Sequence, residues 1–331
     1  MRNLQHFLGD FSMTSLKLKT LLASLALAAS GMAAAQNSLL NVSYDVAREF
    51  YKDYNTAFAA HYKKTTGQDV KIDQSHAGSS AQARAVNDGL AADVVTMNTT
   101  TDVQFLADNG VVAKDWAKKF PHDASPTTST MLFLVRNGNP KNIKDWDDLI
   151  KPGVQVIVVN PKTGGNGRYA YLAAWGAVRE KGGTDAQAAE FVSKLYKNVP
   201  VLAKGGRDAT ATFLQRNQGD VLITFESEVV SIDREFGAGK VDAIYPSVSV
   251  VAENPVAVVE RTVAKKGTAQ LAKATGLPVF RRSPGDRCQA RHPPPLGKGA
   301  QEVRSHVQAA QAVHRGQVFR VAHRGAEGAL Q

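Results

Sequence analysis

The chain has 331 residues, of which 43% are hydrophobic, and its formal net charge is +10. A chain of this length and apolar content can bury the core of one large domain or of two ordinary ones, which excludes a mainly disordered polypeptide. The single cysteine, Cys288, excludes an intramolecular disulfide framework and a cysteine-rich metal site.

The positive charge is concentrated at the two ends of the chain. From Thr275 onward nine Lys and Arg residues stand against three Asp and Glu residues, and the first 35 residues hold three basic residues against one acidic residue. Of the total of +10, only +2 is left for residues 36–274. This body lacks the basic patch with interleaved aromatic residues that is typical of nucleic-acid-binding proteins. We therefore expect no nucleic-acid partner.

The N-terminus has the features of a secretory signal peptide. Lys17 and Lys19 precede the apolar run 21–29 (LLASLALAA), and the small residues 33–35 (AAA) follow it. A signal peptidase cleaves after such an order of segments. The apolar run is too short to span a membrane, which takes about 20 apolar residues. We therefore expect residues 1–35 to be removed on export.

The body alternates short apolar runs with amphipathic segments, which is the pattern of an α/β protein with a mostly parallel sheet. The expected strands are 39–43, 70–72, 93–97, 130–136, 154–159, 221–225, 241–245 and 256–259. The expected helices are 46–65, 80–90, 146–150, 169–179, 186–196 and 209–215. The run 154–159 (VQVIVV) is almost entirely apolar, which indicates a strand buried on both faces.

Three loops that precede expected helices consist mainly of small residues. They are 75–79 (SHAGS), 160–168 (NPKTGGNGR) and 204–207 (KGGR). The first turn of a helix has unpaired N–H groups and a partial positive charge, and glycine lets a ligand approach the backbone closely. One such loop is more often a plain turn. Three of them in one α/β chain favour a shared anion site beyond the ends of the strands.

Six segments of the body resemble the periplasmic sulfate- and thiosulfate-binding proteins. They are LLNVSYDV (39–46), QSHAGSSAQA (74–83), ADVVT (92–96), FLVRNGNPKNIKDWDDL (133–149), NPKTGGNGRYAYLAAWGA (160–177) and GDVLITFESEV (219–229). The resemblance extends over residues 39–274. AGSS, NGRYAYLAAWGA and the Phe225-Glu226 pair are more similar to the thiosulfate-binding branch than to the sulfate-only branch.

This resemblance implies a receptor of an ABC importer with the type II Venus-flytrap fold, in which mostly parallel sheets are flanked by helices and the ligand lies between two domains. Residues 36–127 and 128–254 would form the domains, and 255–274 would return to the first. The implied partners are a thiosulfate or sulfate dianion and the membrane permease and ATPase of the importer. The resemblance further implies that the protein is a periplasmic monomer and not an enzyme. It implies no cofactor, no bound metal and no catalytic residues.

By position, the resemblance also implies the residues of the anion site. The anion-binding residues would be Ser79, Thr163, Gly164, Gly165, Asn166, Gly206 and Phe225, and the supporting residues would be Asp45, Gly78, Ser80, Arg168 and Arg207. Ser79 would donate through its hydroxyl group and its backbone N–H group. The other donors would be the backbone N–H groups of Gly165, Asn166 and Gly206. No positively charged side chain is among these donors.

Three positions depart from the family pattern. Gly164 replaces a serine whose hydroxyl group binds the anion, so that Thr163 would have to supply this donor. Phe225 replaces a tryptophan that donates its indole N–H group in the sulfate-only branch. Each lost hydrogen bond to a charged ligand is worth about 1.5–3 kcal/mol, or roughly tenfold to a hundredfold in affinity. Asp208 replaces a glycine, and a carboxylate there would repel a dianion.

Two alternatives remain open. One is a receptor for another oxyanion, molybdate or phosphate, on the same fold; a phosphate that bears a proton would call for a buried carboxylate acceptor. The other is an exported serine hydrolase, because residues 162–164 match the Lys-Thr-Gly element of penicillin-interacting enzymes. Those enzymes also need a Ser-x-x-Lys element, and no serine of this chain has a lysine three residues later.

Residues 275–331 do not continue the pattern. Apolar periodicity stops, three prolines stand together at 293–295, and four of the eight histidines lie here. Codons for 275–291 and 305–314 can be chosen so that the neighbouring reading frame spells LDFLYSAEAQEIAAKH and ATFKPLKLF, which are similar to the family. We therefore expect a frameshift after about Ala274 that replaces the native C-terminus. Its loss would leave part of the first domain's sheet uncovered and lower the stability of the chain.

Overall fold

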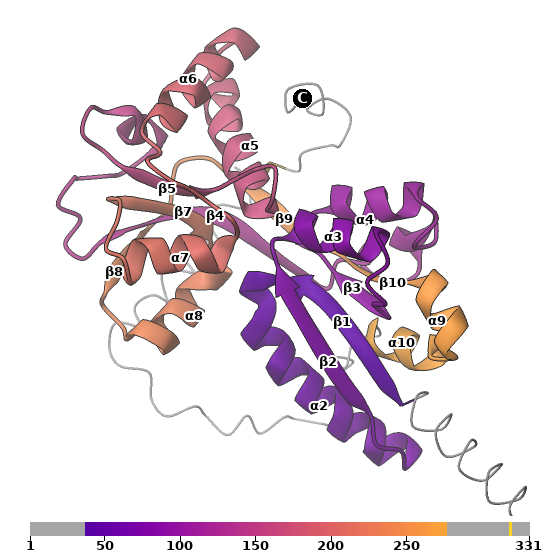
Figure 1. Cartoon of the computed structure of the whole chain (residues 1–331). Coiled ribbons are helices and arrows are strands. Elements are labelled where there is room, and N and C mark those ends of the chain that lie inside the picture. The colour runs from indigo at the N-terminus through magenta and orange to yellow at the C-terminus, as the bar shows by residue number, and fades with distance from the viewer. Residues whose placement is uncertain (1–36, 277–317, 320–331) are drawn as a thin grey trace, which may run out of the picture.

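The computed structural model of the chain describes residues 37–276 and 318–319 (Figure 1). The expected signal peptide, and all but four residues of the segment 275–331 that is expected to be out of frame, lie outside the described residues. Helices and strands alternate along the described chain, whose strands form two sheets flanked by helices (Figure 1). The expected α/β class is therefore confirmed.

The first sheet has four strands in the order β10-β3-β1-β2. Its strands are β1 (Ser38–Tyr44), β2 (Lys71–Ala77), β3 (Val94–Thr96) and β10 (Val256–Val258). The first three are parallel, and β10 is antiparallel to β3. The helical elements around this sheet are η1 (Asp45–Ala47), α2 (Arg48–Thr66), α3 (Ser79–Asn87), α4 (Thr100–Asp108), η2 (Trp116–Lys118), α9 (Glu260–Lys266) and α10 (Ala269–Gly276).

The second sheet has the order β11-β9-β4-β7-β5-β6, and β8 also pairs with β4. Its strands are β4 (Thr127–Arg136), β5 (Val156–Val159), β6 (Leu202–Ala203), β7 (Val221–Phe225), β8 (Val241–Ile244), β9 (Ser249–Asn254) and β11 (Val318–Phe319). The helical elements between these strands are η3 (Trp146–Ile150), α5 (Gly165–Glu180), α6 (Asp185–Lys197), α7 (Gly206–Leu214) and α8 (Ser227–Phe236).

The second sheet is mixed, although the sequence pattern predicts a mostly parallel one. β4 is antiparallel to β7, β8 and β9, whereas β5 is parallel to β6 and β7. The reason lies in the path of the chain. Thr127 at the start of β4 pairs with Asn254 at the end of β9, so the chain enters and leaves this sheet through two adjacent strands that run in opposite directions.

Alternate residues of the central strands fill two separate cores of the second sheet. Met131, Phe133 and Val135 of β4 point into one cluster, and Leu132 and Leu134 point into another. β5 behaves in the same way and is buried over all four of its residues. The prediction that the apolar run 154–159 contains a strand buried on both faces is therefore confirmed. A third cluster covers the first sheet.

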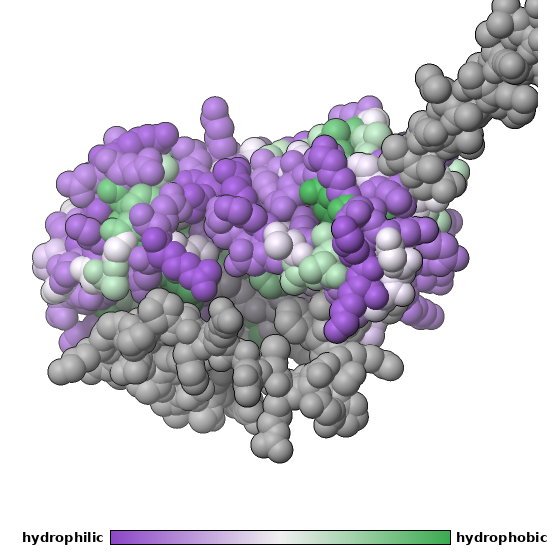
Figure 2. All heavy atoms as spheres, turned by 90° about the horizontal axis from the view of Figure 1, so that it is seen from below, coloured by the Kyte–Doolittle hydropathy of each residue, from purple (hydrophilic) through white to green (hydrophobic). Residues whose placement is uncertain are grey.

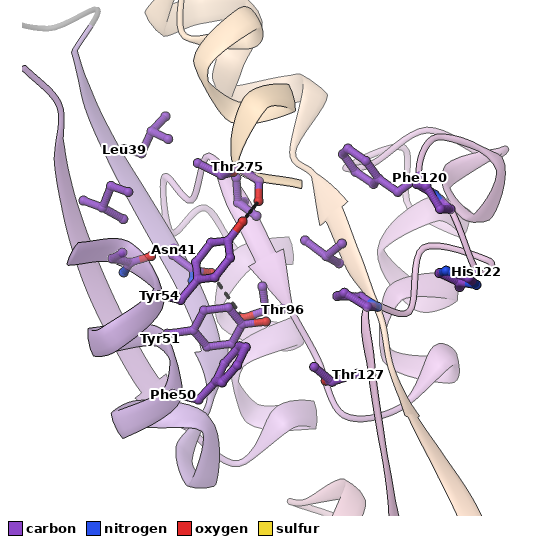
Figure 3. Close-up of a pocket in the computed structure, with 16 residues that line it drawn as sticks. Leu39, Asn41, Phe50, Tyr51, Tyr54, Thr96, Phe120, His122, Thr127 and Thr275 are labelled. Carbon is purple, nitrogen blue, oxygen red and sulfur yellow. Dashed lines mark hydrogen bonds between the residues drawn. The ribbon is translucent and has the colours of Figure 1, made fainter. Parts of the chain in front are cut away.

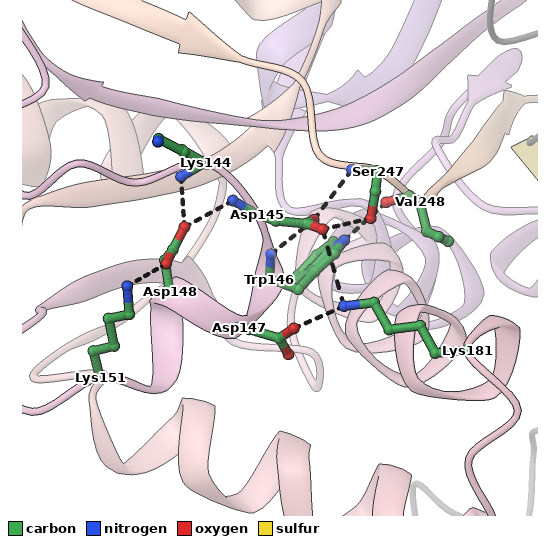
Figure 4. Close-up of polar contacts among 9 residues, drawn as sticks. All are labelled: Lys144, Asp145, Trp146, Asp147, Asp148, Lys151, Lys181, Ser247 and Val248. Carbon is green, nitrogen blue, oxygen red and sulfur yellow. Dashed lines mark hydrogen bonds and ion pairs between the residues drawn. The ribbon is translucent and has the colours of Figure 1, made fainter.

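The acidic run 145–148 (DWDD) has a structural role (Figure 4). Asp145 accepts hydrogen bonds from the backbone of Trp146 and from the backbone and hydroxyl group of Ser247, which fixes the start of η3. The indole N–H group of Trp146 donates to the carbonyl oxygen of Val248 at 2.8 Å. Lys181, the C-cap residue of α5, pairs with Asp147 at 2.7 Å. These contacts attach η3 to the core and leave no free carboxylate cluster for a ligand.

Candidate functional site

Three helices of the structure begin with a glycine as the N-cap residue. Gly78, Gly164 and Gly205 are the N-cap residues of α3, α5 and α7, and no side chain of these residues accepts a hydrogen bond. By contrast, the side chains of Thr99 and Thr184 cap α4 and α6. The first N–H groups of a helix have no partner within it, and they carry its partial positive charge. The three glycine-capped ends therefore offer backbone donors to an anion.

These three helix ends lie against one another. A Cβ atom built on Gly78 would lie 2.5 Å from the carbonyl oxygen of Thr163 and 3.1 Å from that of Lys204. A Cβ atom built on Gly164 would lie 4.0 Å from the Cα atom of Gly205. Because α3 belongs to the first sheet and α5 and α7 to the second, the donors converge between the two halves of the described chain (Figure 1).

Glycine is required here for close approach rather than for an unusual backbone conformation. A Cβ atom on Gly165 would overlap the Oδ1 atom of Asn98, and one on Gly206 would overlap the side chain of Val46. Neither glycine has a positive φ angle. The small residues of these loops thus allow the backbone of one half to touch the other half.

Two side chains of the first half support the helix ends. One carboxylate oxygen of Asp45 accepts a hydrogen bond from the backbone N–H group of Arg207 at 3.0 Å, across the boundary between the halves. The hydroxyl group of Ser79 is fully buried and accepts a hydrogen bond from the backbone N–H group of Asn98 at 3.2 Å. A hydroxyl group can accept and donate at once, so the proton of Ser79 can still be donated.

Arg168 and Arg207 are held by carboxylates. Arg168 pairs with the buried carboxylate of Asp102 at 3.0 Å and donates to the carbonyl oxygen of Pro161. Ser80 donates to the same carboxylate at 3.3 Å. Arg207 pairs with a glutamate of α8, Glu235. Both arginines therefore brace the loops, and the uncharged donors remain the main feature of the site.

Thr163 and Asp208 lie differently from what the family pattern suggests. The single hydroxyl proton of Thr163 is directed at the carbonyl oxygens of Lys204 and Asn160, at 3.0 and 3.2 Å, so this side chain links two loops instead of replacing the missing serine donor. The carboxylate of Asp208 accepts from the backbone of Lys204 and pairs with Arg216 at 3.3 Å. Its charge is therefore partly compensated within α7 and the loop before it.

Phe225 is a core residue in this structure. It is 1% exposed and lies in the same hydrophobic cluster as Tyr44 and Val46, the neighbours of Asp45. Its ring meets that of Tyr169 edge-on, with 5.9 Å between the ring centres. It supports the site by packing and offers no hydrogen-bond donor.

A buried acid, Glu228, was not singled out by the sequence. Burial, reinforced by the charge of Asp45, raises the pKa of its carboxyl group from 4.5 to about 8. Of the described residues none forms a hydrogen bond with its Oε2 atom. At neutral pH the group is mainly protonated, so it adds little negative charge near Asp45. No local motif in the segment 226–229 (ESEV) distinguishes this glutamate from a solvent-exposed one.

A separate cavity of about 550 Å³ lies beside the first sheet (Figure 3). Its walls are mainly apolar and aromatic, with Phe50, Tyr51 and Tyr54 from α2. The hydroxyl group of Tyr54 donates to the carbonyl oxygen of Thr275 at 2.7 Å, at the end of α10 (Figure 3). On the face of the molecule that Figure 2 shows, much of the described surface is hydrophilic. None of the three glycine-capped helix ends lines this cavity, which is therefore distinct from the candidate anion site.

The described residues contain no group of three or more His, Cys, Asp or Glu side chains placed to hold a metal ion. Within the same residues, no helix combines the length and the apolar character that crossing a bilayer requires.

Comparison with known proteins identifies the family. Residues 42–274 match the family described as bacterial extracellular solute-binding protein. The chain is 58% identical to the thiosulfate-binding protein of Pseudomonas aeruginosa over 249 residues, which are 75% of each chain. It is 50% identical to the sulfate-binding protein of Escherichia coli over 249 residues, which cover 75% of this chain and 76% of that one.

A solved structure gives the same result for the fold. The sulfate-binding protein SubI from Mycobacterium tuberculosis H37Rv is 33% identical, with a TM-score of 0.64 over 72% of this chain and 81% of that one. This likeness confirms the type II periplasmic binding protein fold that the resemblance implies. The chain therefore belongs to the family of bacterial extracellular solute-binding proteins.

Proposed function

We propose that the protein binds a thiosulfate or sulfate dianion in the periplasm and delivers it to the permease and ATPase of an ABC importer. The observation that carries this proposal is the meeting of three uncapped helix ends between the two halves of the molecule. The names of the relatives, thiosulfate-binding and sulfate-binding protein, support the same ligands. Catalysis is not part of this function.

Two domains would close around the anion. In this proposal residues 36–127 and 255–274 form one domain and 128–254 form the other, and the adjacent strands β4 and β9 connect them. The donors would be the hydroxyl group of Ser79 and backbone N–H groups of the three helix ends. Asp45 and Arg168 would hold the domains in register, because each bonds across the boundary. The protein would act as a monomer.

Uncharged donors suit a receptor that must release its ligand. Several backbone dipoles can stabilise a desolvated dianion without a cation side chain, since the partial positive charges of helix ends favour anions. A proton-bearing phosphate would in addition need an acceptor at the site. Thiosulfate and sulfate need none, because they carry no proton at neutral pH.

Calorimetric titration of the mature protein with thiosulfate, sulfate, molybdate and phosphate tests the proposal. We expect saturable 1:1 binding of thiosulfate or sulfate and weaker binding of phosphate. Absence of heat with both sulfur oxyanions, from protein shown to be folded, would refute the function. Labelling by a tagged β-lactam would instead favour the exported serine hydrolase.

We also propose that an out-of-frame sequence replaces the native C-terminus after about Ala274. The family match ends at residue 274, which supports this proposal. So does the apolar cavity at the end of α10, because a missing segment would leave such a surface on the first sheet. Resequencing of the gene together with peptide masses of the tail tests it, and an intact reading frame would refute it.

A further inference from the structure

The side chain of Asn166 is buried with half of its hydrogen-bonding capacity unused. Asn166 is 3% exposed, and its Oδ1 atom accepts a hydrogen bond from the Nδ2 atom of Asn98 at 3.3 Å. Its own Nδ2 atom is buried and has no partner among the described residues. Buried amide groups are normally paired, because an unpaired one costs about 1–3 kcal/mol. The unpaired N–H groups therefore point to a missing acceptor.

The orientation of this amide group directs it at the start of α7. A Cβ atom built on Gly206 would lie 3.1 Å from the Nδ2 atom of Asn166. Gly206 is the first residue of α7 and one of the proposed backbone donors. The amide of Asn166 thus lies beside the first residue of α7, whose backbone N–H group is one of the proposed donors.

Asn98 and Asn166 come from different halves of the molecule. Asn98 lies between β3 and α4, on the first sheet, whereas Asn166 is the second residue of α5, on the second. Their hydrogen bond therefore exists only when the halves are together. Because Asn98 donates to the oxygen of Asn166, it leaves the nitrogen of Asn166 turned toward Gly206.

Building on the proposed anion binding, we infer that the side-chain amide of Asn166 donates a hydrogen bond to the bound anion and that Asn98 orients it on closure. Asn166 is thus a binding residue through its side chain as well as its backbone, and Asn98 is a positioning residue. The extra donor compensates for those lost at Gly164 and Phe225. This donor takes up its position only when the two domains meet, so closure of the domains raises the affinity for the anion.

A double-mutant cycle tests this inference by calorimetric titration with thiosulfate and with sulfate. Asn166→Gly keeps the backbone N–H group and removes the amide, so we expect about tenfold to a hundredfold weaker binding. Asn98→Ala keeps its backbone bond to Ser79 and should weaken binding less. Because Asn98 acts through Asn166, the double variant should bind like Asn166→Gly alone. Asn109→Gly, at an exposed asparagine after α4, is the matched control and should bind like the unaltered protein.

The outcomes separate the inference from the proposed function. If the unaltered protein binds neither anion, the proposed function fails. If the unaltered protein binds an anion, two results would overturn the inference. One is an affinity of Asn166→Gly within about twofold of the unaltered protein, and the other is a double variant in which the losses of affinity of Asn166→Gly and Asn98→Ala simply add. Asn166→Asp has nearly the same shape and places a negative charge at the same point. We expect it to lose more than about a hundredfold in affinity while the free protein unfolds at a similar temperature, and near-normal binding by this variant would also overturn the inference.

Discussion

We expect the substitution Gly78→Ala to weaken anion binding while the free protein stays folded. The added methyl group would lie 2.5 Å from the carbonyl oxygen of Thr163 and 3.1 Å from that of Lys204, both of which belong to the opposite half. Backbone atoms cannot move aside as a flexible side chain would. Overpacking of this kind costs about 1–3 kcal/mol, which corresponds to roughly fivefold to 150-fold weaker binding if the closed state must form.

The same substitution is mild in the open state. The φ angle of Gly78 is −56°, which alanine adopts without strain. Alanine is a poorer N-cap residue than glycine, so α3 itself should lose no more than about 1 kcal/mol. Unfolding of the anion-free protein should therefore shift only slightly, and the loss of affinity should arise from closure.

Gly176→Ala is the matched control, because Gly176 lies within α5 and, apart from its chain neighbours and the backbone of its own helix, no atom of the described residues lies within 4 Å of its added Cβ atom. We expect unchanged affinity and a gain of about 0.5–1 kcal/mol in stability. Calorimetry measures the affinity of each variant, thermal unfolding its stability, and small-angle X-ray scattering its contraction on adding anion. Wild-type affinity of Gly78→Ala, or binding lost only together with the fold, would refute the reasoning.

Three further predictions concern charge and the C-terminus. The pKa of Glu228 is raised to about 8, so between pH 4.5 and 8 the native state keeps a proton that the unfolded chain releases. The free energy of unfolding should therefore fall as the pH rises through this window, by at most about 1.4 kcal/mol per pH unit. Urea unfolding of Glu228→Gln at several pH values should show a flatter dependence, and an equally steep one would contradict the assignment. Asp208→Asn should change the affinity for the anion by less than about twofold, because the carboxylate already interacts with Lys204 and Arg216. If titration shows that the affinity of this variant is tenfold higher, the carboxylate does repel the anion. Restoring the reading frame after Ala274 should cover the cavity beside β1 and thereby raise the thermal unfolding temperature. If the present chain and the restored chain unfold at the same temperature, the idea that a frameshift uncovers the sheet is contradicted.

Most strands and the three helix ends could be predicted because their signals are local. The apolar run of β5 and the glycines before α3, α5 and α7 are visible in the sequence itself. The alternation of strands and helices gave the α/β class for the same reason. Local pattern did not reveal β9 (SVVAEN), whose position beside β4 depends on where the chain returns between the sheets. α4, α8, α9 and α10 were also missed.

The side chains that complete the site depend on contacts between distant segments. Nothing near Asn98 in the sequence indicates that it meets Asn166, and nothing near Glu228 indicates its burial. Thr163 was expected to donate to the anion, but its partner Lys204 comes from another loop. Such pairings arise from the packing of segments that are far apart in the chain, which residue spacing does not encode.

The absence of side-chain caps on α3, α5 and α7 has a consequence for the life of the protein in the cell. A capping side chain is worth only a few tenths of a kcal/mol more than a glycine N-cap, so with three such ends the empty receptor forgoes on the order of 1 kcal/mol at the place where its ligand enters. An arriving anion restores that stability as part of its binding free energy. Cells short of sulfur would thus hold receptors that are easier for proteases to open, and the nutrient itself would prolong the lifetime of the protein that collects it.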